Sequence, residues 1–155
     1  MKTEASRVLF GLGKKLKMED PRVTIIIACY NDEEYIEKAI NSAMKQNYDG
    51  PLTICVINDG STDGSWDLIT PSGGNVEKDT FEGEDVLISY PSKDFSNRKL
   101  VIVNRQNGGP SAARNTGIKY TLEHTDIYGV LDADDEMYPD KIQTCVEVMK
   151  KDMLS

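Results

Sequence analysis

Residues 23–29 form an unbroken, mainly β-branched run, Val-Thr-Ile-Ile-Ile-Ala-Cys, and no other feature constrains the fold of this chain as strongly. A strand with one face in water alternates apolar and polar side chains, whereas this run does not alternate. It is therefore predicted to be a strand buried on both faces, as in a parallel sheet covered by helices. Since parallel strands need long crossover connections, helices are expected between this strand and the next ones.

A helix pattern follows this strand directly. Asn31 and Glu34 have the form of a capping box, although Asn stands where Ser or Thr is usual. The helix is expected to end near Asn47, before Asp49-Gly50-Pro51, and its apolar residues recur at helical spacing: Ile36, Ala39, Ile40, Ala43 and Met44. Residues 52–57 are then predicted to form a second buried strand, parallel to the first.

The rest of the chain repeats this alternation. After a short helical turn around 66–69, strands are expected at 99–103 and from residue 127 onward. Helices are expected to begin at Pro110, a plausible first-turn proline, and at Pro139. The last helix should run to about Lys151 and turn three residues inward: Ile142, Val146 and Met149.

This order predicts an α/β fold, a Rossmann-like three-layer sandwich with a mainly parallel sheet. Residues 71–98 are rich in Gly, Ser, Asp, Glu and Lys and are interpreted as a long excursion that carries one short strand. Residues 21–155 are expected to form the domain, whereas residues 1–20 form a separate segment that is amphipathic or flexible.

Composition and charge argue against several classes of protein. A chain of 155 residues fits one domain, and its net charge of -8 argues against a nucleic-acid partner because no basic excess would neutralise a phosphate backbone. Three cysteines without CxxC spacing imply neither a zinc site nor a disulfide framework. No apolar run approaches the ~20 residues that span a bilayer. A reduced, cytoplasmic protein is expected, with peripheral membrane association left open.

Polar residues follow the end of every predicted parallel strand. Tyr30-Asn31 follows the first strand, Asp59 the second, the Gly108-Gly109 loop leading to Arg114 the third, and Asp132-Ala133-Asp134 the fourth. In an open parallel sheet, ligands bind at this carboxyl edge. Two carboxylates close together favour a hard divalent cation, which takes carboxylate, water and phosphate oxygens as ligands. The pattern predicts a metal-assisted site for a phosphorylated ligand, and an acidic turn that caps the next helix is the alternative.

Each of these residues has a use at a nucleotide diphosphate and a plainer alternative. Tyr30 can stack on a base or belong to the rim, and Asp59 can accept hydrogen bonds from the ligand or form an Asx-type turn. Gly108 and Gly109 can let the backbone approach a ligand or simply make a turn. Arg114 can reach a pyrophosphate with its fork of donors or form a surface ion pair.

Taken together, the motifs resemble the family 2 glycosyltransferases of the GT-A fold over residues 22–150. The matching stretches are 24–31, 56–63, 107–115 and Leu131-Asp132-Ala133-Asp134-Asp135 followed by Pro139. The resemblance implies a base pocket lined by Ala28, Tyr30 and Asn31 in which Asp59 holds the base. It also implies a nucleotide held by Gly108, Gly109 and Arg114. It also implies a DXD motif in which Asp132 and Ala133 contact the nucleotide sugar while Asp134, with Asp132, holds Mn²⁺ or Mg²⁺.

The chain departs from the family pattern in three places. Ala28 stands where proline is common, and Asn58 where a first aspartate is often found. The family's general base is expected in the acceptor half beyond Ser155. The remaining strands of the sheet are expected there too, so the sheet of this chain is expected to be incomplete at its C-terminal end. The catalytic base therefore has no candidate in this chain, and a partner polypeptide that completes the acceptor site is one expectation.

The resemblance implies transfer of a sugar from a nucleoside diphosphate sugar, with UDP favoured, to an acceptor hydroxyl of a glycan, lipid or protein, with inversion. A non-catalytic module that binds a nucleotide sugar or metal is the alternative. A dinucleotide-dependent dehydrogenase is disfavoured because no GxGxxG follows the first strand. A receiver-like domain is disfavoured because Tyr30-Asn31 replaces the expected acidic pair, although Asp32 and Glu33 lie close to that position.

Overall fold

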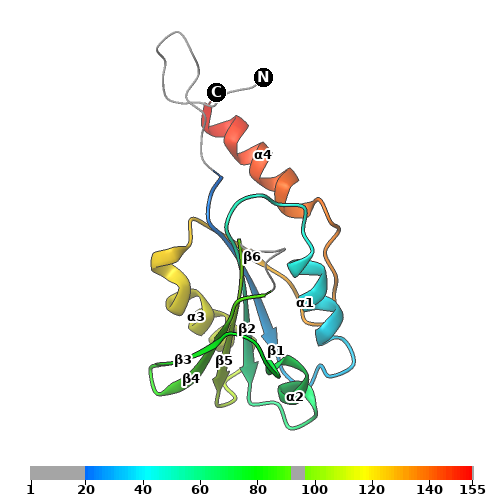
Figure 1. Cartoon of the computed structure of the whole chain (residues 1–155), viewed down its shortest axis with the longest axis vertical. Helices are drawn as coiled ribbons and strands as arrows, with labels where there is room; N and C mark the ends of the chain where they lie inside the picture. The colour runs from blue at the N-terminus through cyan, green and yellow to red at the C-terminus, as the bar shows by residue number, and fades with distance from the viewer. Residues whose placement is uncertain (1–19, 92–96, 155) are drawn as a thin grey trace.

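The computed structural model describes residues 20–91 and 97–154, so most of the predicted N-terminal segment lies outside the described residues. A six-stranded sheet in the order β3-β4-β5-β2-β1-β6 forms the centre (Figure 1). Its strands are β1 (Val23–Cys29), β2 (Leu52–Asp59), β3 (Val76–Phe81), β4 (Glu84–Ser89), β5 (Arg98–Arg105) and β6 (Ile127–Val130). The helices are α1 (Ile36–Met44), α2 (Ser65–Ile69), α3 (Pro110–Thr121), the 3-10 helix η2 (Leu122–His124) and α4 (Lys141–Leu154).

Four neighbouring strands, β5, β2, β1 and β6, run parallel, which confirms the predicted mainly parallel sheet. Val23 of β1 lies in register with Leu52 of β2 on one side and with Ile127 of β6 on the other. The residues of β1 are almost all buried, as the unbroken apolar run predicts. The four strands therefore end at a common edge, where the polar loops begin.

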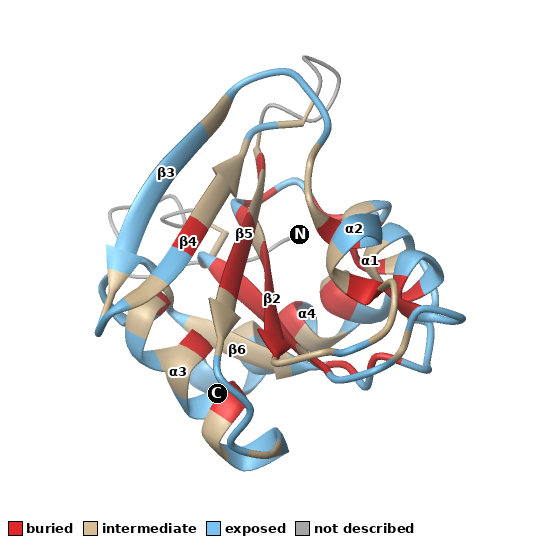
Figure 2. Ribbon diagram, turned by 90° about the horizontal axis from the view of Figure 1, so that it is seen from below, coloured by how far each residue is buried: buried red, intermediate tan, exposed pale blue. Residues whose placement is uncertain are grey.

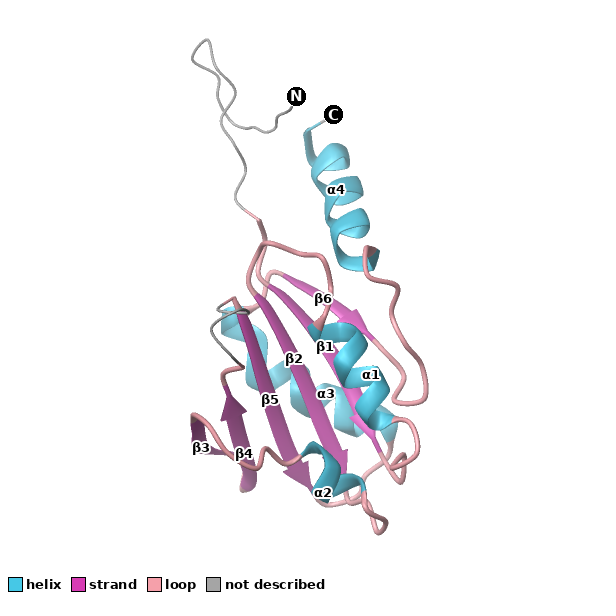
Figure 3. Ribbon diagram, turned by 45° about the vertical axis from the view of Figure 1, so that its right-hand side comes forward, coloured by secondary structure: helices cyan, strands magenta, loops and turns pink. Residues whose placement is uncertain are grey.

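Helices cover both faces of this sheet, so the molecule has the predicted three layers (Figure 3). Ile25 and Ile27 belong to a core that also contains the buried residues of α1 and α4. Ile26 points to the opposite face, where the core includes Ala113 of α3. Gly117 lets α3 approach the sheet closely, because a Cβ there would lie 2.6 Å from Ile57 Cδ1. Alternate residues of one strand thus hold helices on the two faces.

Residues 71–98 contain the predicted short strand as β4, but they also contain a second strand, β3, which the prediction lacks, and the two form a hairpin. β4 pairs antiparallel with β5, and β3 is the outer edge strand. The polar residues of β3 are exposed, whereas Val86 of β4 is fully buried against β5 (Figure 2). An edge strand with little buried surface lacks the apolar pattern by which strands are recognised.

Two helix predictions also need correction. Asn31 caps no helix, since α1 begins at Ile36 without a side-chain cap, and α1 ends at Met44 rather than near Asn47. The following segment is held instead by the buried Arg98, whose guanidinium donates to the carbonyls of residues 44, 46 and 48. These contacts fix the non-helical path of the chain that follows α1.

The last helix, α4, begins at Lys141, and Ile142 and Val146 are buried as predicted. Met149 is 42% exposed, so its predicted inward position is wrong. The second half of α4, to which Met149 belongs, extends past the sheet (Figure 3). None of the helices within residues 20–91 and 97–154 is long and apolar enough to cross a bilayer.

Candidate functional site

The sheet order brings together the polar residues predicted to converge. Asp59 ends β2, while Tyr30 and Asn31 directly follow the neighbouring strand β1. Asp132 comes two residues after β6, on the other side of β1. Tyr30 is 48% exposed, so its ring is accessible to a ligand, and Ala28 lies partly buried just before it in β1. The site is therefore an open edge with an exposed aromatic ring near its middle.

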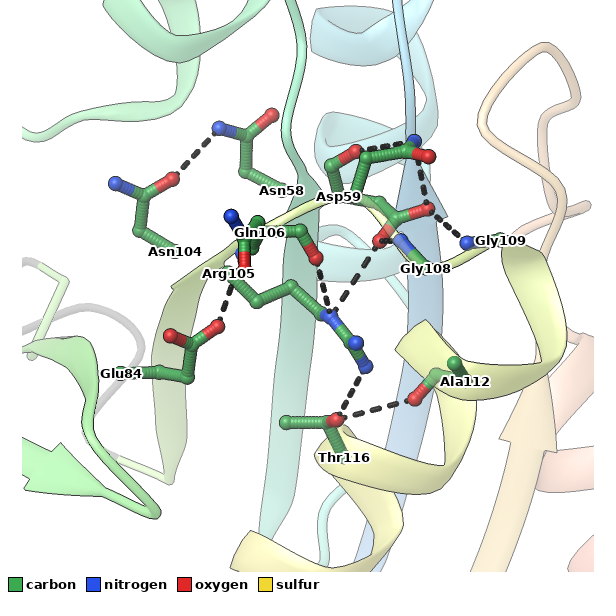
Figure 4. A network of polar contacts seen from close by, with 11 residues as sticks. Asn58, Asp59, Glu84, Asn104, Arg105, Gln106, Gly108, Gly109, Ala112 and Thr116 are labelled. Atoms are coloured by element: carbon green, nitrogen blue, oxygen red, sulfur yellow. Dashed lines mark hydrogen bonds and ion pairs between the residues drawn. The ribbon is translucent and has the colours of Figure 1, made fainter.

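Asp59 is almost completely buried and holds the loop between β5 and α3. Its Oδ1 accepts from the backbone N–H of Gly108 at 2.9 Å, and its Oδ2 accepts from that of Gly109 at 2.9 Å (Figure 4). The Asn107 side chain also donates to the Asp59 carbonyl at 2.9 Å. Gly109 has φ of 96°, a left-handed conformation that suits glycine. Both glycines thus serve a turn that Asp59 fixes, and contact between Asp59 and a base stays a prediction.

Arg105 is a member of this network that the sequence reasoning missed. Its Nε lies 3.4 Å from Asp59 Oδ1, and its Nη1 donates to the Thr116 hydroxyl at 2.8 Å. Asp59 and Arg105 are register partners at the ends of adjacent parallel strands. The sequence held a signal for this pair. Asp59 and Arg105 each lie two residues beyond a predicted strand, so slightly longer strands would have placed both at neighbouring strand ends. The guanidinium partly balances a carboxylate that would otherwise be buried beside amide groups alone.

Asn31 joins two loops. Its Oδ1 accepts from the backbone N–H of Thr62 at 2.7 Å and of Asp63 at 3.2 Å, and its own N–H donates to the Ser61 hydroxyl at 3.0 Å. Asn31 has φ of 53°, a conformation that Asn tolerates better than most residues. The structure therefore uses the Asn31 side chain to tie the β1–α1 loop to the β2–α2 loop, next to Tyr30. A direct contact with the nucleotide sugar stays a prediction.

The Asp-Ala-Asp turn after β6 alternates buried and exposed residues. Leu131 and Ala133 are buried in the core, whereas Asp132 and Asp134 are exposed. Burial of the two apolar residues thus turns both carboxylates outward on the same segment. Ala133 can reach a ligand only through its backbone, since its side chain packs inward.

Arg114 brings α3 to this turn. Its Nη2 lies 3.5 Å from Asp132 Oδ1, and its Nε is buried without a hydrogen-bond partner. A buried donor that makes no hydrogen bond is costly, by roughly 1–3 kcal/mol. The rest of the guanidinium is partly exposed, so its terminal nitrogens are available to an acceptor such as a phosphate oxygen.

Negative charge accumulates around the turn. The pKa of Asp32 is raised by burial and by the charges of Asp134 and Asp63, although the Tyr30 N–H bond opposes this shift. Among the described residues, no group of three or more His, Cys, Asp and Glu side chains could hold a metal ion. Asp132 and Asp134 nevertheless fit a Mg²⁺-type ion that takes one or two carboxylates and completes its shell with water and substrate phosphates.

A mainly parallel sheet with an Asp-Ala-Asp turn at its carboxyl edge defines the GT-A class of fold. The structure of S. aureus TarS 1-349 in complex with UDP matches it with a TM-score of 0.61 and 19% identity, covering 84% of this chain and 32% of that one. A mannosyltransferase from Pyrobaculum calidifontis in complex with GDP-Man and Mn²⁺ matches with a TM-score of 0.56 and 22% identity, covering 84% and 32%. These likenesses confirm the predicted fold class.

The family model described as "Glycosyl transferase family 2" matches residues 24–76 and 84–155, and the chain therefore belongs to this family of glycosyltransferases. Chondroitin synthase from Pasteurella multocida (strain Pm70) is 28% identical over 158 residues, covering 98% of this chain and 14% of that protein. Hyaluronan synthase from Pasteurella multocida is 30% identical over 145 residues, covering 90% and 12%. The chain thus spans a small part of the length of these relatives.

Proposed function

We propose that this chain is the donor-binding domain of a glycosyltransferase that uses a nucleoside diphosphate sugar. In the proposed reaction the sugar passes from the diphosphate to an acceptor hydroxyl of a glycan, lipid or protein, with inversion at the anomeric carbon. Solved structures of the same fold hold UDP, UDP-GlcNAc or GDP-Man, which makes these three ligands the natural probes. A UDP-sugar is the favoured donor.

The arrangement of Arg114 beside the Asp-Ala-Asp turn carries this proposal. The buried Nε of Arg114 has no partner, while its Nη2 lies 3.5 Å from Asp132 Oδ1. A diphosphate placed here would accept from the guanidinium, and Asp132 and Asp134 would hold a divalent cation whose charge offsets that of the diphosphate. The diphosphate would then be held from two sides by groups of opposite sign.

Each group of the site has a role in this proposal. A Mn²⁺ or Mg²⁺ ion would supply Lewis-acid stabilisation of the leaving diphosphate. Arg114 would add a fixed positive charge near the same oxygens, and the exposed ring of Tyr30 would stack on the base. Asp59 would keep the Gly108-Gly109 backbone in place beside the nucleotide, and this role does not require Asp59 to contact the base. The domain limits of 21–155 and the cytoplasmic setting remain parts of the proposal.

Calorimetry of this chain with UDP, UDP-GlcNAc and GDP-Man, with and without Mn²⁺, tests the assignment. We expect one nucleotide to bind more tightly when Mn²⁺ is present. Asp134→Asn should remove the metal-dependent part of the affinity, because an amide oxygen is a weaker ligand for a hard cation. Asp135→Asn, at the exposed neighbouring position, is the matched control and should keep that part.

Two results would overturn the proposal. The first is the absence of binding for all three nucleotides at any Mn²⁺ concentration. The second is unchanged metal-dependent binding in Asp134→Asn, which would place the cation elsewhere.

A further inference from the structure

A cavity of about 450 Å³ lies between the β3–β4 hairpin and the ends of β2 and β5. Asn58 and Asn104 contribute to its wall from the sheet, Trp66 from α2, and Glu84 and Asp85 from the hairpin. None of the residues predicted to hold the nucleotide or the metal lines it. Successive residues of a strand point to opposite faces, so Asn58 reaches the cavity while Asp59 faces the Gly108-Gly109 loop. The cavity is thus a compartment separate from the diphosphate corner.

A buried acceptor in this wall has no partner. Asn58 is 3% exposed, and its Nδ2 donates to Asn104 Oδ1 at 2.8 Å (Figure 4). The Oδ1 of Asn58 is buried and accepts no hydrogen bond. Buried amide oxygens are almost always satisfied by protein, ligand or ordered water, so this atom has an acceptor site left for a further hydrogen bond.

The charges of the wall disfavour an anionic ligand, because two carboxylates face one guanidinium. Glu84 and Asp85 contribute carboxylates, and Glu84 Oε2 accepts the Gln106 backbone N–H at 3.0 Å. Arg105 also reaches the cavity, but its Nε faces Asp59 Oδ1 at 3.4 Å and its Nη1 faces the Thr116 hydroxyl. Among the described residues of the wall there are thus two carboxylates and one guanidinium whose Nε and Nη1 are already engaged, which suits a ligand rich in hydroxyl donors better than a phosphate.

The hairpin that borders the cavity includes a stretch outside the family match. The family match stops at residue 76 and resumes at 84, so Gly83 of the wall lies in the unmatched stretch. The hairpin is fixed to α3, because the Tyr120 hydroxyl donates to Asp79 Oδ2 at 2.8 Å and the Phe81 and Tyr120 rings meet edge to face at 5.4 Å. The wall is consequently formed in advance of any ligand.

We propose that this cavity is a docking site for an uncharged saccharide. Sugar hydroxyls would donate to Asn58 Oδ1 and to the carboxylates of Glu84 and Asp85, and the apolar face of a sugar ring would lie against Trp66. The saccharide class rests on the proposed function, since a glycosyltransferase handles sugar chains. Because the cavity lies beside the donor site, the bound saccharide would be a unit of the acceptor or of the growing chain.

The single tryptophan of the chain makes the site observable, because Trp66 lines the cavity and all tryptophan fluorescence reports on it. The probes are glucose, N-acetylglucosamine, cellobiose and N,N′-diacetylchitobiose, titrated into the full chain. At least one should change the fluorescence in a saturable way. Asn58→Ala should weaken that binding at least tenfold, whereas Asn41→Ala, at an exposed position of α1, should leave it unchanged.

Asp85→Asn provides a second variant, because Asp85 is exposed and its substitution should not disturb folding. It should weaken saccharide binding even if Asn58→Ala proves unfolded by circular dichroism. The absence of a saturable change with all four sugars would overturn the inference, and so would full affinity in a folded Asn58→Ala variant.

Calorimetry with UDP and Mn²⁺ on the same samples separates this inference from the proposed function. Nucleotide binding without saccharide binding would refute the docking site and leave the donor-site assignment standing. Saccharide binding without nucleotide binding would refute the donor-site assignment and leave the docking site standing. If UDP displaces the saccharide and Asn58→Ala weakens both equally, the cavity belongs to the donor pocket and the separate site is refuted.

Discussion

Arg114 Nη2 lies 3.5 Å from Asp132 Oδ1, which joins helix α3 to the turn after β6 across a wide separation in sequence. If this guanidinium also holds the diphosphate, Arg114→Gln should weaken UDP binding roughly ten- to a hundredfold, since hydrogen bonds to charged groups contribute about 1.5–3 kcal/mol. Calorimetry with saturating Mn²⁺ measures the change. Lys119→Gln, at an exposed position on the same helix, is the control and should bind UDP normally. Equal affinity in Arg114→Gln and wild type would contradict the assignment.

Asp59→Asn should lower the free energy of unfolding by about 2–3 kcal/mol, because an amide has one acceptor oxygen for two backbone donors and leaves Arg105 poorly paired. Urea denaturation measures this loss. Hydrogen exchange at the Gly108 and Gly109 amides should also accelerate, since both donate to the Asp59 carboxylate. Asp67→Asn, at an exposed position of α2, should change stability by less than about 0.5 kcal/mol. Unchanged protection of both glycine amides would show that the loop does not depend on Asp59.

Gly117→Ala should destabilise the protein although alanine is the better helix former. The new Cβ would lie 2.6 Å from Ile57 Cδ1 and 3.3 Å from Cys55 Sγ, both fully buried. Overpacking costs about 1–3 kcal/mol, whereas the gain in helix propensity is at most about 1 kcal/mol. We therefore expect a net loss of about 1 kcal/mol in urea denaturation, with Lys119→Ala as the surface control. A rise in stability would mean that the helix and sheet have room to separate.

The ion pair between Arg22 and Asp126 should make stability depend on acidic pH. Arg22 Nη2 lies 2.8 Å from Asp126 Oδ1, and the side-chain hydrogen bond from Arg22, with one from its backbone, lowers the pKa of Asp126 to about 2. The pKa in the unfolded chain is about 3.9, so the stabilisation is complete above that value and is lost as the pH falls through about 2.

Asp126→Asn measures this contribution, which solvent screening should keep small because nearly half of each side chain is exposed. The difference in unfolding free energy between wild type and variant should be constant above about pH 5 and shrink toward pH 2. It should also shrink in about 1 M NaCl, where exposed charges are screened. A difference that grows on acidification would contradict the origin assigned to the lowered pKa.

Much of the fold was predictable because its signals are local. The buried runs at 23–29 and 52–57 lie in central strands, and Pro110 begins α3 as expected. The β3–β4 hairpin was not predictable as two strands, since β3 is an exposed edge whose residues carry no apolar alternation. The end of α1 was missed because Arg98, about fifty residues away, captures the carbonyls that follow it.

For the candidate site as well, some features followed from the sequence and others only from the structure. The sequence by itself determined that the polar residues gather at one edge, because a central parallel strand requires its neighbours to end on the same side. It also indicated that Asp132 and Asp134 follow the fourth parallel strand, whereas their outward orientation was seen only once Leu131 and Ala133 proved buried. The resemblance of the motifs to family 2 glycosyltransferases was also visible in the sequence alone, and the family match over most of the chain confirms it.

Only the tertiary structure decided how the polar side chains are used. Asp59 is committed to the amides of Gly108 and Gly109, and Asn31 to the loop of Thr62 and Asp63, whereas Arg114 keeps a donor without a partner. The physical reason is that hydrogen-bond partners lie thirty to fifty residues apart and meet only when the sheet has formed. A residue pattern shows which groups can bind a ligand, but packing decides which of them are still available to one.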